Sequence, residues 1–168
     1  MPQLIRSASS LLEYAIETYP PQLNASTPSD PVTATLMVTV RRKAPSRNVR
    51  CDKLSLGLRT GEGGPAWTNN RSVMTGGVEG GDEPGQGDGW DWSPRDDGEW
   101  RVFHFEPTTT AEFDGWQLTV KVFEIQINNA PGWADLEIVE KTSTSGSTTE
   151  KTTSHRVQKA PKEFVFHS

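Results

Sequence analysis

The sequence predicts an all-β protein, an antiparallel β-sandwich of two sheets that is broadly immunoglobulin-like and carries long Gly/Asp/Trp-rich and Ser/Thr-rich loops. Two observations support this prediction. Several segments alternate apolar and polar side chains with a period of two, as strands with one buried face do. Clusters of Gly, Pro, Asn and Ser separate these segments, and none of the segments shows an unambiguous helical pattern.

Length and composition limit the organisation of the chain. Its 168 residues fit a single domain, 1–168, and only 33% are hydrophobic, whereas Gly (15) and Pro (12) are frequent, so we expect a thin core and long loops. No apolar run approaches the roughly 20 residues that a membrane-spanning helix needs, and no secretion signal is evident, so we expect a soluble chain of unassigned compartment. Cys51 is the only cysteine, which excludes an intrachain disulfide and a cysteine-based metal cluster.

Residues 1–31 are expected to form a strand or a short helix, followed by a linker. The segment 10–19 fits a helix because Ser10 and Glu13 could form a capping box. It also fits a strand because its apolar and polar residues alternate. We favour the strand, since the rest of the chain predicts β structure and tertiary pairing often overrides a weak local preference. The helix remains an alternative.

Three segments in the middle of the chain predict strands. Residues 32–41 and 54–59 alternate cleanly, and we expect these two strands to pair or to face each other. Residues 99–106 carry apolar groups on both faces, which predicts a central, well-covered strand.

The longest alternating run spans residues 116–127. Its apolar phase slips by one residue after Val122, which predicts a β-bulge or a strand buried on both faces. A turn-forming cluster at 128–132 leads into a second alternating run at 133–140. We therefore expect the two runs to form an antiparallel hairpin.

The segment 141–154 is rich in Ser and Thr and predicts a flexible surface loop. Alternatively, its β-branched threonines extend the flanking strands into a long hairpin, and only 145–147 remain as its tip. A last strand is expected around Phe164 and Phe166. Because the chain ends on that apolar strand, we expect either a module cut from a longer polypeptide or a strand that closes the sheet.

Residues 76–98 predict an acidic, Gly-rich loop in which carboxylates and a closely wrapped backbone could hold a Ca²⁺ ion. The spacing matches neither the EF-hand loop nor the repeated Gly-Asp nonapeptide, so a plain solvated loop is the alternative. No other cofactor is expected. The candidate metal ligands are Asp82, Asp88, Asp91, Asp96 and Asp97.

Four tryptophans that lie in predicted loops or beside a turn are candidate binding residues: Trp67, Trp90, Trp92 and Trp133. An indole that stays in water is unfavourable, so something should cover each of them. Either they fold back as lids on the end of the sandwich, or they contact a sugar ring, a membrane interface or a protein partner.

Charge is segregated along the sequence. Acidic residues crowd 79–99, whereas a basic patch is formed by Arg41, Arg42, Lys43, Arg47, Arg50 and Lys53. The net charge of -5 argues against a general nucleic-acid binder. We expect the two regions to steer the domain onto a complementary surface, such as a second copy or a neighbouring module, with Arg41, Arg42 and Lys43 in the contact.

No catalytic motif is evident, and the histidines at 104, 155 and 167 lack the spacing of a zinc site. We therefore expect a non-enzymatic binding or assembly module, in a larger protein or a homo-oligomeric particle, that binds a protein partner or itself. The first alternative is a secreted carbohydrate- or membrane-binding, toxin-like protein with a calcium-binding acidic loop. The second is a hydrolase that uses loop carboxylates, such as Asp91 with Asp96 or Asp97.

Overall fold

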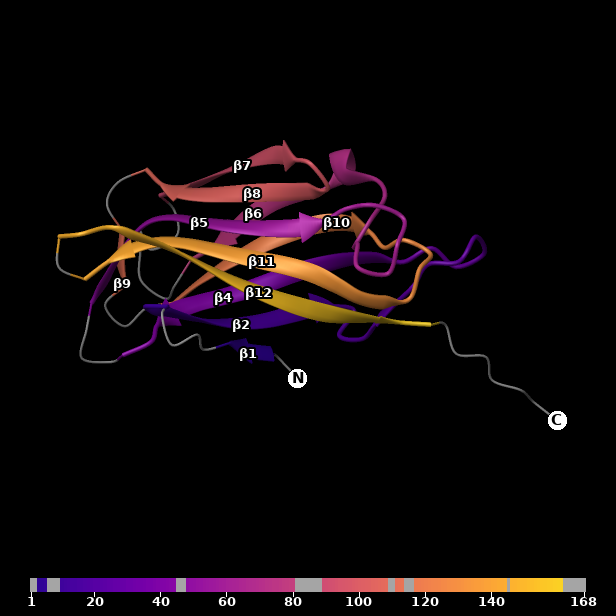
Figure 1. Cartoon of the computed structure of the whole chain (residues 1–168), viewed down its shortest axis with the longest axis horizontal. Coiled ribbons are helices and arrows are strands. Elements are labelled where there is room, and N and C mark those ends of the chain that lie inside the picture. Colours follow the sequence, from indigo (N-terminus) through magenta and orange to yellow (C-terminus); the bar gives the residue numbers. More distant parts are fainter. Residues whose placement is uncertain are drawn as a thin grey trace.

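The alternating segments fold into two stacked sheets whose strands run along the long axis of the molecule (Figure 1). In this computed structural model the described part of the chain is all-β apart from one 3₁₀ turn, Arg71–Val73. It includes no helix with the length and apolarity needed to cross a bilayer. The structure describes residues 3–5, 10–44, 48–80, 89–108, 111–113, 117–144 and 146–161.

The first sheet has five strands and is antiparallel throughout. Their order is β1 (Gln3–Ile5), β2 (Leu12–Tyr19), β4 (Thr33–Arg42), β10 (Gln117–Gln126) and β6 (Thr75–Glu79).

The second sheet has seven strands, and its pairs are antiparallel except for the short parallel pair of β12 with β3. Strand β9 (Ala111–Phe113) pairs with β5 off the main path. The order of that path is β3 (Leu23–Asn24), β12 (Thr149–Ala160), β11 (Gly132–Ser143), β5 (Val49–Arg59), β8 (Trp100–Pro107) and β7 (Trp90–Asp97).

The core lies between the two sheets. Leu36 and Leu118 come from the first sheet, Leu56 and Leu136 from the second, and each is at most 1% exposed within one buried cluster. Apolar side chains from both inner faces thus supply the burial that stabilises the sandwich. The predicted strands at 32–41 and 54–59 face each other across this core, because β4 and β5 belong to different sheets.

Residues 10–19 form strand β2, which confirms the favoured alternative and shows that the helix is wrong. Leu12, Tyr14 and Ile16 are buried, as alternation requires. Pairing with β4 along the whole of β2 fixes the extended conformation. Tertiary pairing therefore decides between two local patterns of similar strength.

The predicted hairpin between 116–127 and 133–140 is wrong, because β10 lies in the first sheet and β11 in the second. The predicted bulge is present: the register shifts between Val122 and Ile125, and Glu124 has φ 59°. Beyond it the chain crosses between the sheets, where Asn128 is 3% exposed and its side-chain amide donates to the carbonyls of Gly61 and Gly63 at 2.9 Å. The turn-forming cluster therefore serves a crossing between layers. Trp116 lies outside the described residues.

Two segments expected as loops contain more strand than predicted. Within 76–98, residues Thr75–Glu79 form β6 and Trp90–Asp97 form β7. The ladder with β8 holds β7 in place, despite its Pro and its many acids, at the edge of the sheet where such residues are tolerated. Within 141–154, β11 and β12 extend into one long hairpin, joined through 144–148, as the alternative interpretation expects. The segment around Phe164 and Phe166 lies outside the described residues.

Candidate binding face

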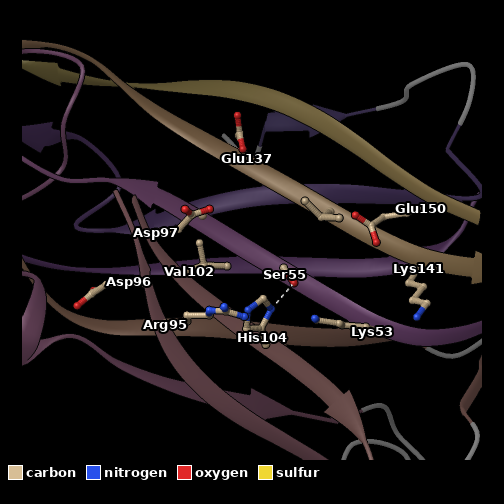
Figure 2. Close-up of a pocket in the computed structure, with 12 residues that line it drawn as sticks. Lys53, Ser55, Arg95, Asp96, Asp97, Val102, His104, Glu137, Lys141 and Glu150 are labelled. Atoms are coloured by element: carbon tan, nitrogen blue, oxygen red, sulfur yellow. Dashed lines mark hydrogen bonds between the residues drawn. The ribbon is translucent and has the colours of Figure 1, made fainter. Parts of the chain in front are cut away.

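The outer face of the second sheet has a hollow at its centre, formed around Gly57. In the register of the sheet, Gly57 on β5 lies between Val102 on β8 and Glu137 on β11. Because Gly57 has no side chain, its neighbours enclose a space of about 400 Å³ that we call the central hollow (Figure 2). Ser55, two residues earlier on the same face, lies opposite His104 and also lines this space.

Charged side chains surround the central hollow. Figure 2 shows Arg95, His104 and Lys53 on one side, with Asp97 and Glu137 across from them. Six of the charged groups that line the hollow form neither an ion pair nor a side-chain hydrogen bond with any described residue. They are Lys53, Arg95, Asp97, Glu137, Lys141 and Glu150. Donors and acceptors that lack partners around a concave surface are available to a ligand.

His104 is the histidine that lines the central hollow. Its Nδ1 atom lies 2.8 Å from the hydroxyl of Ser55. Desolvation, with smaller effects of nearby Lys53 and Arg95, lowers the pKa of His104 against the opposing effect of Glu106. The ring is therefore mostly neutral at pH 7 and can both donate and accept. No carboxylate of the described residues hydrogen-bonds to this ring, so the Ser55–His104 pair lacks the acidic partner of a catalytic triad.

A second, wider space of about 590 Å³ adjoins the central hollow, and Glu137 lines both. Trp100 and Trp133 contribute aromatic surface to it, and the Trp133 residue is 53% exposed. Asp135 nearby accepts from Arg59 at 3.1 Å, and Arg156 lies 3.4 Å from the same carboxyl group. We call this space the tryptophan hollow and the two hollows together the outer-face groove.

Of the four tryptophans predicted as binding residues, Trp133 alone lines the groove. Trp67 is fully buried, and its indole N–H donates to the carbonyl of Asp135 at 2.9 Å. Trp90 is 8% exposed and belongs to the core. Trp92 is partly exposed and packs against Phe103 on the inner side of β7. Burial thus removes Trp67 and Trp90 from the surface, as the lid interpretation expects for them.

Of the predicted basic patch, Lys53 lines the groove, whereas the three residues predicted to bind a partner do not. Arg41 is paired with Glu13, and Arg42 donates to Asn48 at 2.8 Å. Lys43 follows β4 and donates its backbone N–H to Leu11 at 3.0 Å. These residues belong to strand β4 of the first sheet and the segment after it, whereas the groove belongs to the second sheet.

Two of the described members of the predicted carboxylate group line the central hollow, and the third does not. Asp96 and Asp97 line the hollow, and Asp96 pairs with Arg101 at 2.8 Å. Asp91 is separated from Asp97 along β7 by roughly 20 Å at the usual rise of 3.3 Å per residue, too far for one ion or for a pair of glycosidase carboxylates. Among the described residues no three His, Cys, Asp or Glu side chains are grouped to hold a metal. Asp82 and Asp88 lie outside the described residues.

Most residues that form the groove are not identified by the sequence patterns, which point to loops. They occupy outward positions of ordinary strands: Ser55, Gly57, Trp100, His104, Glu137 and Lys141. One signal is present in the sequence, because a glycine inside a strand pattern marks a bulge or a close approach of another group. Gly57 has this place in the run Leu54–Leu58.

Cys51 shows no sign of reactivity. It is fully buried in β5, and burial raises the pKa of its thiol far above the usual range. A thiol in this state is a small apolar core residue.

Comparisons with known proteins give little beyond the fold. No family model matches the chain, and no curated protein matches its sequence. Among solved structures, the GAE domain of GGA2p from Saccharomyces cerevisiae aligns over 95% of this chain and 100% of its own, with TM-score 0.44 and 10% identity. A collagen-binding domain from a Staphylococcus aureus adhesin aligns over 90% and 99%, with TM-score 0.45 and 10% identity. The bacterial hydrophobin BslA aligns over 90% and 96%, with TM-score 0.43 and 10% identity. Similarities this distant identify no family and no function, and what the coordinates establish is an all-β sandwich of two sheets.

Proposed function

We propose that this chain is a non-enzymatic binding module that recognises a polar ligand along the outer face of its second sheet. One observation supports the proposal most. Unpaired charged side chains surround a glycine-floored hollow, and the hollow continues into a space lined by the exposed Trp133. Ligand sites are typically concave and carry a few polar groups that converge on the space, and this arrangement has both features.

The arrangement favours binding over catalysis. The Ser55–His104 pair has no acidic partner among the described residues. Asp91 lies too far along β7 from Asp97 for the two to act as a catalytic pair. A binding site needs only complementary shape and polar groups, and the outer-face groove provides both.

A protein partner is the second candidate for the same face. Trp133 with Arg156 beside it has the composition of an interface hot spot, in which an aromatic anchor lies within a charged rim. Trp133 stands on β11, which is paired on both sides, so a partner bound there would dock on side chains and not extend the sheet.

The variant Gly57→Leu tests the proposal, because a side chain here points into the central hollow. A Cβ atom at this position would lie 3.4 Å from Trp100 and 3.7 Å from Glu137, which is ordinary contact, and circular dichroism checks that the rest of the Leu side chain leaves the fold intact. The control is Thr35→Leu on the outer face of the first sheet. We would measure binding of the wild type and both variants to a glycan array and to a displayed peptide library.

The proposal expects the wild type and Thr35→Leu to bind the same probes, and Gly57→Leu to lose them while its circular dichroism stays unchanged. Binding that survives in Gly57→Leu would show that the groove is not the site. A wild type that binds neither probe set would contradict the proposed function itself.

A further inference from the structure

We infer that the outer-face groove binds an acidic oligosaccharide lengthwise, with a sugar ring on Trp133 and a carboxylate or sulfate group near Lys53 and Lys141. This inference deepens the proposed function and depends on it.

The aromatic end suits a sugar ring. Trp133 is 53% exposed although it lies on a strand, and Trp100 lines the same tryptophan hollow. One face of a pyranose ring consists of C–H groups, which pack on an indole and cover its apolar surface. Asp135 and Arg156 at the margin offer an acceptor and a donor to the hydroxyls around that ring.

The middle of the groove suits hydroxyl groups better than a phosphate backbone. Glu137 and Asp97 contribute acceptors, and the Ser55–His104 pair contributes groups that both donate and accept. Each sugar hydroxyl is itself both donor and acceptor, so it can satisfy neighbours of either kind. Four carboxylates line the central hollow, those of Asp96, Asp97, Glu137 and Glu150. Together with the net charge of -5 they disfavour a ligand that is charged on every unit, such as RNA, and leave the position between the lysines for a single anionic group.

The basic end suits an anionic group. Lys53 and Lys141 lie directly opposite each other on β5 and β11, and like charges in this relation are destabilising. Figure 2 shows Arg95 extending toward His104 beside them. Glu150 lies opposite Lys141 on the other side, but neither lysine reaches an ion pair with a described residue. A ligand carboxylate or sulfate between the lysines would offset their repulsion.

The length of the groove requires a chain of several sugars. Trp133 and Lys141 stand on the same face of β11, roughly 26 Å apart at the usual 3.3 Å rise per residue. A single monosaccharide cannot contact both ends. An extended peptide is less suited, because peptides gain affinity by pairing with a free strand edge. The path from Trp133 to Lys141 follows β11, which is paired on both sides, whereas β7 at the margin of the groove is an edge strand.

Titration calorimetry with three oligosaccharides of equal length tests the inference: a β-glucan with one terminal glucuronate, a β-glucan with one terminal sulfate and a neutral β-glucan. We expect one or both acidic chains to bind more tightly than the neutral one, and more weakly as salt is raised. Trp133→Ala should weaken binding about tenfold, and Lys53→Ala with Lys141→Ala should weaken the acidic chains by a similar factor.

Matched controls remove similar groups elsewhere. Tyr19→Ala deletes an aromatic residue that is 67% exposed, and Lys121→Ala with Arg42→Ala deletes two cations from the first sheet. Both controls should bind as the wild type does.

Three results would overturn the inference. Equal binding of acidic and neutral chains, unaffected by the double lysine variant, would contradict the anionic end, and unchanged binding by Trp133→Ala would contradict the aromatic end. Absence of binding to all three chains, together with peptide binding that Gly57→Leu abolishes, would reject a glycan ligand and retain the proposed function.

Discussion

The indole of Trp92 lies directly on the backbone of Gly76, where a Cβ atom would be only 2.7 Å from the ring. Trp92 belongs to β7 of the second sheet and Gly76 to β6 of the first. The pair therefore joins the two sheets at one edge of the sandwich, where β6 and β7 lie close together (Figure 1). A glycine is needed here because the ring occupies the space of a side chain.

Replacing Gly76 by Ala should lower the free energy of unfolding by about 1–3 kcal/mol, since the added methyl group overpacks the contact with Trp92. Urea unfolding measures the change. Gly57→Ala is the control, because a Cβ atom there meets its nearest neighbour at 3.4 Å and needs little adjustment.

A double-mutant cycle checks the cause. In a Trp92→Ala background the space above residue 76 is open, so Gly76→Ala should cost much less there than in the wild type. An equal cost in both backgrounds would show that Trp92 is not the obstacle.

Tyr14→Phe should lower the free energy of unfolding by about 1.5–3 kcal/mol, because the hydroxyl of Tyr14 donates to the buried carboxylate of Glu140 at 2.7 Å. Thr142 donates to the same carboxylate at 2.8 Å, and the backbone N–H of Leu11 does so at 3.2 Å. Burial, and then the Glu140 charge, raises the pKa of Tyr14, which keeps the donor protonated.

Urea unfolding at pH 7 gives this value. Thr39→Val supplies the comparison, since the hydroxyl of Thr39 bonds a neutral partner, Thr119, on a partly exposed face. A cost for Tyr14→Phe no larger than that of Thr39→Val would argue against a special role for the Glu140 cluster.

Lys159 should make stability depend on pH in the alkaline range. Its residue is 1% exposed, and burial lowers its pKa from 10.5 to about 8. Between these two values the unfolded chain binds more protons at this residue than the folded chain, so its contribution to stability rises as pH increases from 8 to 10.5. Below pH 8 the folded protein must keep the ammonium buried against Asn128 and Ala130.

The variant Lys159→Met removes this dependence while it retains an unbranched apolar stem. Unfolding free energies at pH 7 and at pH 10 should show the wild type gaining stability relative to Lys159→Met at the higher pH. A difference between the two proteins that is constant with pH would contradict the prediction.

His155 should make stability depend on pH in the acidic range. Burial lowers the pKa of His155 below its ordinary 6.5, so the unfolded chain binds the extra proton first as pH falls. Stability should therefore decrease as pH falls through 6.5 and below, and His155→Gln should lessen that decrease. Thermal unfolding of the two proteins between pH 7.5 and pH 5 measures it, and parallel curves would contradict it.

The sequence predicts strands well because the period-two pattern reports which face is buried. Leu12, Leu36, Leu56 and Leu136 all occupy the inward positions that alternation assigns to them. The pattern does not report which strands pair. The turn-rich segment around Asn128 looks like a hairpin turn, and only the buried side chain of Asn128 with its carbonyl partners reveals a crossing between sheets.

The candidate site was harder to predict for a related reason. Outward strand positions such as Ser55 and Glu137 carry ordinary polar residues, and their meaning depends on which neighbours the register places beside them. Trp67 and Trp90 are predicted as binding residues because they are large apolar residues in predicted loops. Both are buried, so they act as core packing residues.

Amide chemical shifts of the ¹⁵N-labelled protein during titration with the glucuronate-terminated β-glucan map where the ligand contacts the chain. We expect the shifts to concentrate on the outer-face groove, at Ser55, Gly57, His104, Glu137 and the indole N–H of Trp133. Shifts that concentrate instead on β2, β4 and β10 of the first sheet would contradict this expectation.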